Sequence, residues 1–285
     1  MQFGATLPPW VGEVGSPVAD ASNQSPAPAL RTDDELLDRL ERYLDRLDLA
    51  PGLDGLADAM RYSLDGGGKR IRPLLCLAVG DALGSDPDEL LPAAAAIELV
   101  HTFSLVHDDL PGLDDDDVRR GRESTHVRFG EGVAVIAGDA LLAEAFRLTL
   151  SYGRTNVARA LGDATLGMIG GQYLDVTGSA AGELELSRLK TGRLFEASVG
   201  LALEVAGVDE QERPPWTTFA RELGVVFQLG DDLVDGDGYA ARHGVDETRR
   251  LAGEAGARAR GALAETGART DVLAALLARV AERAS

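Results

Sequence analysis

Two clusters of aspartates have the residue type and the setting of a metal site. The first reads DDLPGLDDDD and starts at Asp108, and the second reads DDLVD and starts at Asp231. Each follows an apolar stretch, VHTFSLVH before the first and LGVVFQLG before the second. Carboxylates beside a hydrophobic core are costly unless positive charge neutralises them. Oxygen ligands suit Mg²⁺, which usually binds one or two carboxylates together with substrate phosphates.

Helical spacing places further polar side chains beside both clusters, at positions i, i+3 and i+7 of one helix face. They are His101, Ser104 and Asp108 in the first stretch, and Gln228, Asp231 and Asp235 in the second. If the two helices face each other across a cavity, their carboxylates form one metal-binding rim. The pair Pro111 and Gly112 should end the first helix, so that Asp114 turns back toward Asp108.

The basic residues suggest which kind of ligand would bind together with the metal. Of 28 basic residues only Lys69 and Lys190 are lysines, so each is a candidate for a role that needs a compact ammonium group. Lys69 lies in GGGKRIRP, and Lys190 lies in LKTG beside Thr191. Arg119 and Arg120 directly follow the first aspartate cluster. Each basic residue alone could be ordinary surface charge, but carboxylates, a metal and clustered cations together describe a diphosphate pocket.

Composition excludes several classes of function. A net charge of −19 argues against binding to nucleic acid or to anionic membranes. The single cysteine, Cys76, excludes a disulfide framework and fits a reducing compartment, so we expect a cytoplasmic protein. No stretch reaches the roughly 18 continuous apolar residues of a membrane span, and we expect none. The amino-terminal residues do not have the pattern of a signal peptide.

The elements that must position these residues are helices. Residues 1–30 are rich in Pro, Ala and Ser and predict a disordered leader, and residues 31–285 predict a single all-α domain. Thr32 and Glu35 have capping-box spacing. Helical periodicity then appears near 55–64, 70–82, 92–109, 133–151, 156–175, 184–206, 215–235 and 247–284, the last with a break near Gly267. The run VAVIAGDALLAEAF is apolar nearly all round, which favours the centre of a large bundle.

Six segments, taken in order, resemble the trans-prenyl diphosphate synthases. They are GGGKRIRP, ELVHTFSLVHDDLPGLDDDDVRRG, HVRFGEGVAVIAGDALLAEAF, GGQYLD, LKTG and FQLGDDLVD, and they lie within about residues 35–240. The resemblance implies an all-α bundle around a central cavity and usually a homodimer. It also implies Mg²⁺-dependent condensation of isopentenyl diphosphate with an allylic diphosphate.

The resemblance also implies roles for individual residues. The metal-binding motifs are Asp108, Asp109 and Asp114, and then Asp231, Asp232 and Asp235. The diphosphate of isopentenyl diphosphate is held by Lys69, Arg72, His101 and Arg120. The allylic diphosphate is held by Arg119 and Lys190. Polar positions near the reacting carbons are Thr191, Gln172 and Gln228. The residues expected to act in the reaction itself are Asp108, Asp114, Lys190, Thr191, Gln228 and Asp231.

Product length is expected to depend on Phe103. It lies five residues before Asp108, about 7.5 Å further along a helix axis, whereas Ser104 lies almost directly beneath Asp108. In the resembling family, bulky residues at this depth form a floor that stops chain growth. Phe103 as a floor favours a 15-carbon farnesyl product, with the 20-carbon geranylgeranyl product next. The alternative is that Phe103, some 140° round the helix, packs into a neighbouring helix and never meets the product.

The chain departs from the family pattern after Asp235. The family usually has a flexible loop with a lysine there, but this sequence reads GDGYAARHGVDETRR. Two other readings therefore stay open. A class I terpene cyclase also uses an aspartate-rich motif, but normally lacks the second cluster and the GGGKRIRP-like segment. A non-catalytic subunit of a heteromeric synthase tends to lose aspartates, and both clusters are intact here.

Overall fold

A capping box starts the first helix, α1 (Asp33–Asp45), as the sequence predicts. The backbone N–H of Thr32 donates to the Glu35 carboxylate at 2.8 Å, and the Glu35 N–H donates to the Thr32 hydroxyl at 3.3 Å. Leu36, Leu40 and Leu44 are buried along the inner face of α1. The computed structural model describes residues 31–178 and 188–284, so the predicted disordered leader lies outside the described residues.

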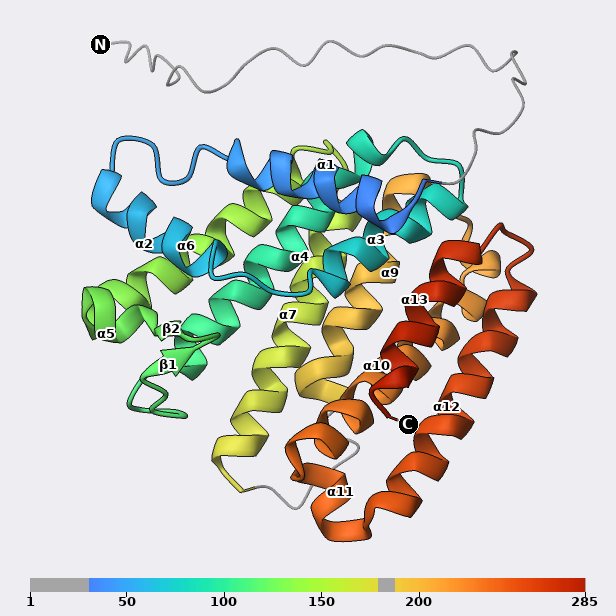
Figure 1. Ribbon diagram of the computed structural model, residues 1–285. Helices are drawn as coiled ribbons and strands as arrows, with labels where there is room; N and C mark the ends of the chain where they lie inside the picture. The colour runs from blue at the N-terminus through green and yellow to red at the C-terminus, as the bar shows by residue number, and fades with distance from the viewer. Residues whose placement is uncertain (1–30, 179–187, 285) are drawn as a thin grey trace, which may run out of the picture.

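The described residues form a helical bundle, which confirms the all-α fold class (Figure 1). The first half contains α2 (Asp54–Leu64), α3 (Ile71–Ala82), α4 (Pro87–Asp108), α5 (Thr125–Phe129), α6 (Glu131–Leu150) and α7 (Thr155–Val176). The second half contains the π-helical turn η1 (Arg188–Gly192), α9 (Arg193–Ala206), the 3₁₀ turn η2 (Glu210–Glu212), α10 (Pro214–Asp235), α11 (Gly238–His243), α12 (Val245–Glu265) and α13 (Asp271–Glu282). The long helices lie close to their predicted ranges. Gly267, with φ of 68°, lies in the predicted break between α12 and α13.

Helix α4 is the centre of the bundle and carries the first aspartate cluster at its carboxyl end (Figure 1). It contacts α1, α2, α3, α6, α7 and α9. Four consecutive alanines, residues 93–96, are fully buried, and their small side chains let the neighbouring helices approach closely. By length and composition alone α4 could cross a membrane, but 72% of its most apolar 18-residue stretch is buried inside the bundle. Core helices of water-soluble proteins pass the same test, so this is weak support for a membrane span.

The apolar helix α6 is not central on all sides, which corrects the expectation for VAVIAGDALLAEAF. One face packs against α4 through Ala134, Ala137 and Leu141, which are fully buried. On the outer side Ile136 is 57% exposed, and two valines of the same helix are also exposed. The neighbouring helix α7 exposes apolar residues too. We call the exposed apolar residues that do not line a cavity the α6–α7 surface, made of Val133, Val135, Ile136 and Leu166.

The segment after α4 folds back on the helix end, as the Pro-Gly pair predicts. The backbone N–H of Asp114 donates to the carbonyl of Asp108 at 2.9 Å, and that of Asp116 donates to the carbonyl of Asp109 at 3.2 Å. A two-stranded antiparallel hairpin follows, β1 (Val118–Arg119) and β2 (Arg122–Glu123), which the sequence did not predict. Arg120 in its turn has a left-handed backbone, with φ of 55°. The hairpin therefore brings Arg119 and Arg120 beside the end of α4.

Candidate active site

Asp108 is the half-buried carboxylate of the first cluster, at the last residue of α4. Burial raises the pKa of Asp108 to about 6, although the positive charge of Lys190 opposes the shift. The nearby carboxylate of Asp114 raises it further. Burial disfavours the charged form of a carboxylate, and a cation placed beside it would offset that cost. Asp108 therefore has the surroundings of a ligand for an added cation.

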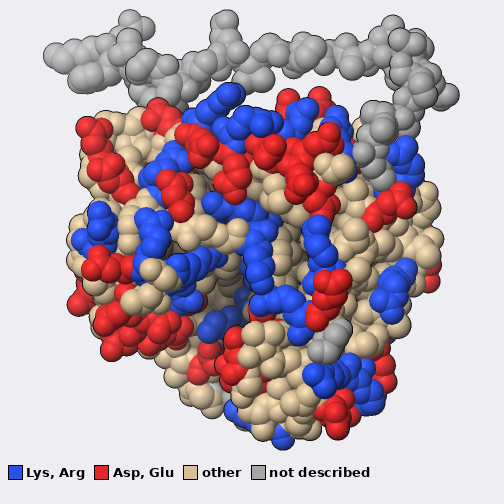
Figure 2. Space-filling view, viewed as in Figure 1, with Lys and Arg blue, Asp and Glu red and all other residues tan. Residues whose placement is uncertain are grey.

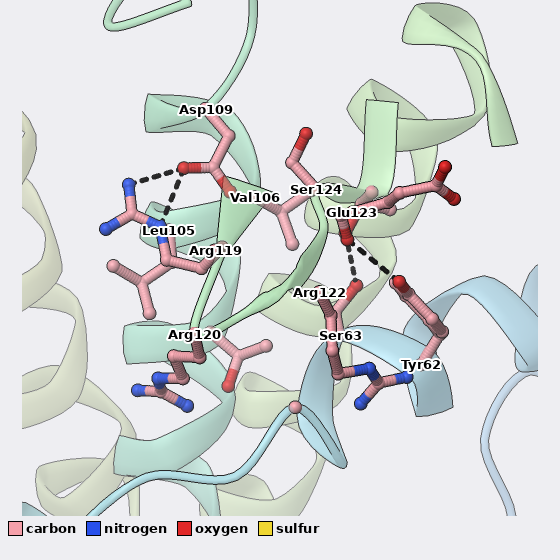
Figure 3. Close-up of a pocket in the computed structure, with 13 residues that line it drawn as sticks. Tyr62, Ser63, Leu105, Val106, Asp109, Arg119, Arg120, Arg122, Glu123 and Ser124 are labelled. Atoms are coloured by element: carbon pink, nitrogen blue, oxygen red, sulfur yellow. Dashed lines mark hydrogen bonds and ion pairs between the residues drawn. The ribbon is translucent and has the colours of Figure 1, made fainter. Parts of the chain in front are cut away.

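Asp109, the next residue, is buried and is engaged inside the protein (Figure 3). The Arg119 guanidinium donates to its Oδ1 through Nε at 2.8 Å, and Nη2 contacts the same oxygen. Burial lowers the pKa of Arg119, but the hydrogen bond and charge of Asp109 outweigh this and raise it overall. A cavity of about 40 Å³ lies behind the pair, between the hairpin and Tyr62 of α2. Asp109 therefore anchors the hairpin to α4.

The second cluster ends α10, and its first carboxylate already has a partner. Arg283, the residue after α13, places Nη1 2.6 Å from Asp231 Oδ1. Burial raises the pKa of Asp231, while the charges of Arg283 and Lys69 act against the rise. Asp235 is exposed, and it lines the same cavity as Asp231. Sequence reasoning missed Arg283, because nothing in the local pattern links it to a cluster so far away in the chain.

Asp232 is buried and accepts two hydrogen bonds from the protein. Gln228 Nε2 donates to Oδ1 at 2.8 Å, and the backbone N–H of Tyr239 donates to Oδ2 at 2.9 Å. Gly238 has φ of +48°, and a Cβ there would lie 2.7 Å from the Asp232 carboxylate, so only glycine fits this turn. Asp232 therefore joins α10 to α11. Gln228 lines a separate small cavity between η1 and α10.

A large polar cavity collects the cations that the sequence analysis singled out. Its volume is about 750 Å³. Figure 2 shows this face of the molecule hollowed, with Lys and Arg side chains gathered around the hollow. The charged residues and the histidine that line the polar cavity are Lys69, Arg70, Arg72, Glu98, His101, Arg119, Arg120, Asp231, Asp235 and Arg283. Basic side chains predominate, so the polar cavity suits a multiply charged anion.

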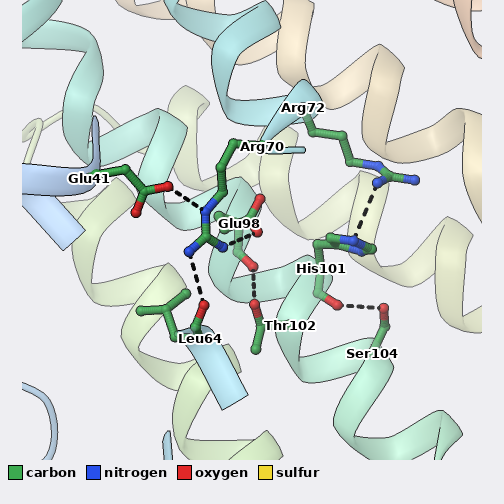
Figure 4. Close-up of polar contacts among 8 residues, drawn as sticks. All are labelled: Glu41, Leu64, Arg70, Arg72, Glu98, His101, Thr102 and Ser104. Carbon is green, nitrogen blue, oxygen red and sulfur yellow. Dashed lines mark hydrogen bonds and ion pairs between the residues drawn. The ribbon is translucent and has the colours of Figure 1, made fainter. Parts of the chain in front are cut away.

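Arg72 and His101 form the inner wall of the polar cavity (Figure 4). Burial lowers the pKa of Arg72 to about 10, and its Nε has no hydrogen-bond partner among the described residues. Its Nη1 lies 3.4 Å from His101 Nε2, and its guanidinium stacks over Phe195 and Phe227. Burial, followed by the charges of Arg72 and Arg120, lowers the pKa of His101 well below its ordinary value, so its ring is neutral near pH 7. A buried arginine with an unused donor is a built-in anion site.

Arg70 has a different role from its neighbours Lys69 and Arg72 (Figure 4). Its backbone is left-handed, with φ of 46°, which turns the side chain into the protein. It donates to Glu98 at 2.6 Å, to Glu41 at 2.9 Å and to the carbonyl of Leu64 at 2.9 Å. The GGGKRIRP segment is therefore tied to α1, α2 and α4 by its middle cation, which leaves the flanking cations beside the polar cavity.

An apolar cavity of about 600 Å³ adjoins the polar cavity, with Arg72 and His101 in the lining of both. Besides Arg72 and His101, its polar lining consists of Ser104, His107, Asp108, Asp139, Gln172, Tyr173, Lys190 and Thr191. Its apolar lining includes Phe103, Leu142, Met168, Ile169 and Leu194. Both amide atoms of Gln172 are buried without a hydrogen-bond partner, so the amide is free for a ligand. Phe103 lines this cavity and packs edge-on against His107, with ring centroids 5.0 Å apart.

Lys190 and Thr191 lie in the π-helical turn η1, a feature often found at functional sites. The Lys190 ammonium pairs with Asp175 of α7 at 2.8 Å. A Cβ on Gly171 would lie 2.7 Å from the Lys190 backbone nitrogen, so this glycine lets α7 approach η1. The glycine and aspartate of the GGQYLD segment therefore both help to place Lys190 at the apolar cavity.

The carboxylates suit a metal that arrives together with its anion. No three His, Cys, Asp or Glu residues converge on a ready-made metal site in the ranges 31–178 and 188–284. The cavity-facing donors are hard oxygen ligands: Asp108 lines the apolar cavity, and Asp231 and Asp235 line the adjoining polar cavity. Mg²⁺ typically binds one or two carboxylates and completes its octahedron with water and phosphate oxygens. The site therefore fits Mg²⁺ bound jointly by the protein and a diphosphate.

Comparison with known proteins identifies the chain's relatives. The polyprenyl synthetase family model matches residues 54–246. The chain belongs to the polyprenyl synthetase family. It is 41% identical over 222 residues to a farnesyl diphosphate synthase of Geobacillus stearothermophilus, a match that covers 72% of this chain and 73% of the relative. It is 40% identical over 193 residues to a chloroplastic geranylgeranyl pyrophosphate synthase of Catharanthus roseus, covering 62% of this chain and 54% of the relative.

Solved structures agree with this family. A geranyltransferase of Legionella pneumophila superposes with a TM-score of 0.80 at 31% sequence identity, covering 88% of this chain and 96% of that one. An FPP/GFPP synthase of Zymomonas mobilis also gives a TM-score of 0.80, at 30% identity, covering 87% and 97%. The resemblance drawn from the sequence motifs is confirmed, and the synthetase is a prenyltransferase with the all-α fold of these enzymes.

Proposed function

We propose that this synthetase condenses isopentenyl diphosphate with an allylic diphosphate to give a short-chain trans-prenyl diphosphate in isoprenoid biosynthesis. The observation that supports this most strongly is the meeting of the two cavities at Arg72 and His101. A polar cavity with clustered cations matches the charged end of a substrate, and the adjoining apolar cavity matches a growing hydrocarbon chain. Curated relatives are named as farnesyl and geranylgeranyl diphosphate synthases.

The polar cavity would hold isopentenyl diphosphate. Lys69, Arg72 and Arg120 line it and would pair with the diphosphate oxygens. His101 is neutral, so it can donate one hydrogen bond without adding charge. The fixed Arg70–Glu98 pair would keep these groups in place before substrate arrives.

The allylic diphosphate would bind beside the first aspartate cluster. Lys190 would contact it directly, while Arg119 would act there together with Asp109. Asp108 and Asp114, with Asp231 and Asp235 from the other cluster, would hold Mg²⁺, whereas Asp109 and Asp232 would position the elements around them. When bound, Mg²⁺ supplies positive charge that stabilises the leaving diphosphate.

The proposed reaction breaks the allylic C–O bond and leaves a carbocation and a diphosphate anion. The double bond of isopentenyl diphosphate then supplies the electron pair for the new C–C bond, and the proton that is lost afterwards passes to the departing diphosphate. The Gln172 amide and the Thr191 hydroxyl lie in the cavity lining where the cation would form, while Gln228 would act more remotely through Asp232. The apolar walls keep water from the cation.

We also propose that residues 31–285 work as a single domain, that the enzyme is a homodimer and that it is cytoplasmic. The α6–α7 surface supports the dimer, because its exposed apolar side chains would be buried by a second copy. The buried, unpaired thiol of Cys76 fits a reducing compartment.

Incubation of the purified protein with Mg²⁺, isopentenyl diphosphate and a series of allylic diphosphates tests the activity. A prenyl diphosphate longer by five carbons or more is expected. A hydrocarbon product would instead indicate a terpene cyclase. No product without an added second protein would indicate the non-catalytic subunit of a heteromeric synthase.

Product length should be limited by Phe103, with the farnesyl chain favoured and the geranylgeranyl chain next. Phe103 is part of the cavity lining, so a shorter side chain there lengthens the cavity. Phe103→Ala is expected to shift the product upward by at least one five-carbon unit in chromatographic product analysis. Ser104→Phe is the reciprocal variant and should shorten the product. Identical product distributions for wild type and Phe103→Ala would place the floor elsewhere.

A further inference from the structure

Arg283, the residue after α13, reaches the second aspartate cluster although it lies 52 positions after Asp231 in the sequence. Its Nη1 lies 2.6 Å from Asp231 Oδ1, and its side chain lines the polar cavity. The backbone at this point is fixed against α10: Ala284 packs with Leu229 in a small apolar cluster, and a Cβ on Gly230 would lie 3.4 Å from Arg283 Cβ. The guanidinium is therefore held at Asp231 by the packing of α13 on α10.

The charges around Asp231 explain why a cation is held there. The carboxylate of Asp235, one helical turn away, repels the carboxylate of Asp231, while the more distant charges of Lys69 and Arg72 attract it. Arg283 is the cation in direct contact. A metal ion bound to Asp231 would have to approach its oxygen to about 2.0–2.1 Å if it were Mg²⁺. Such an ion and the guanidinium would repel each other strongly across one carboxylate.

We infer that Arg283 is the internal counter-cation of the second aspartate cluster and that it must leave Asp231 when a divalent metal binds there. This inference rests on the proposed function, since it takes Asp231 as a metal ligand. The Arg283 Cζ also lies 5.8 Å from the centroid of the Phe227 ring, so part of its packing does not depend on Asp231. Arg283 thus lowers the metal affinity of the enzyme without substrate and favours loading of the metal together with a diphosphate.

Direct metal binding tests the inference in the absence of substrate and turnover. The probe is Mn²⁺, titrated into the metal-free enzyme of residues 1–285 and followed by electron paramagnetic resonance. Arg283→Gln is expected to bind Mn²⁺ about tenfold more tightly than wild type, equivalent to about 1.4 kcal/mol. Arg283→Lys keeps the charge and should lie closer to wild type. The matched control is Arg279→Gln, one turn earlier on α13, whose partner is Asp33 and which should leave the affinity unchanged.

Repeating the substitution in an Asp231→Asn variant distinguishes an effect through Asp231 from a general structural effect. With Asp231→Asn already in place, adding Arg283→Gln should no longer change Mn²⁺ affinity. Equal or weaker Mn²⁺ binding by Arg283→Gln than by wild type would overturn the inference, as would the same gain in both backgrounds. The prenyl-transfer assay reports on the proposed function separately: an active wild type with unchanged Mn²⁺ binding in Arg283→Gln rejects only the role of Arg283.

Discussion

The first aspartate cluster is held by a hairpin and the second by the carboxyl-terminal helix, although both begin with the same Asp-Asp pair. In each pair the first residue lines one of the two large cavities and the second is buried: Asp108 lines the apolar cavity and Asp231 the polar cavity, whereas Asp109 and Asp232 are buried and hydrogen-bonded within the protein. Adjacent residues point about 100° apart on a helix, so both cannot face the same space. Repeated acidic letters in a motif therefore do not imply equivalent ligands.

The two clusters also differ in how their cavity-facing carboxylate is neutralised. Asp231 is in direct contact with Arg283. For Asp108 the largest effect of a neighbouring charge comes from Lys190, whose ammonium is itself paired with Asp175. Asp108 accordingly keeps a pKa of about 6. The cavity-facing carboxylate of the first cluster therefore still needs a cation. That of the second cluster is already neutralised by Arg283, which a bound metal could replace.

The largest expected effect is the loss of turnover when a cavity-facing carboxylate is removed. Asp108→Ala and Asp231→Ala should each lower kcat on the order of a thousandfold, because they remove support for charge on the leaving group. Both proteins should still fold, as circular dichroism and thermal unfolding can check. Steady-state assays at saturating Mg²⁺ measure the effect. A normal rate in either variant would reject the metal-binding role of that cluster.

Substitution of each lysine should affect a different substrate, so the two lysines distinguish the roles of the two clusters. Lys190→Arg should lower kcat/KM for the allylic substrate about tenfold, because a rigid guanidinium fork replaces a compact ammonium in the π-helical turn. Lys69→Arg should act mainly on KM for isopentenyl diphosphate. Varying each substrate in turn at a fixed concentration of the other separates the two results. Wild-type kinetics for Lys190→Arg would show that the type of cation is unimportant there.

The buried aspartates should affect stability more than catalysis. Asp109→Asn breaks a charge-assisted pair with Arg119 and should lower the free energy of unfolding by about 1–3 kcal/mol. Asp232→Asn can keep one of its two hydrogen bonds and should cost about 1 kcal/mol. Urea denaturation measures both values. If either variant lost turnover as completely as Asp108→Ala while unfolding like wild type, the division between cavity-facing and buried aspartates would be wrong.

The smallest expected effect is the pH dependence of metal-free stability at Asp108. Its pKa in the folded protein, about 6, is above the ordinary value of 3.8, so the charged form is disfavoured by folding. This cost is fully present above about pH 6 and disappears below about pH 4, where the group is protonated in both states. Asp108→Asn should therefore raise Tm by about 2–4 °C at pH 7.5 and leave it unchanged at pH 4. An equal Tm difference at both values of pH would rule out titration of Asp108 as the cause.

Much of the architecture could be predicted because it depends on local periodicity. The capping box at Thr32, the long helices, the break at Gly267 and the return of Asp114 to the end of α4 all follow from residues close in sequence. The short elements were missed: the β1–β2 hairpin, α5, η2 and α11 have too few residues for a periodic signal. The π-helical turn around Lys190 has no sequence signature of its own.

The sequence by itself determined the helices, the positions of both aspartate clusters and the family, because spacing along a helix and the order of motifs are local properties. Tertiary structure decided how each charged residue is used. The side chain of Arg70 pairs with the buried Glu98, and that of Asp109 pairs with Arg119. Asp232 accepts a hydrogen bond from the start of α11, and Arg283 pairs with Asp231. These choices depend on which helix faces pack together, and contacts between distant residues leave no periodic trace in a single sequence.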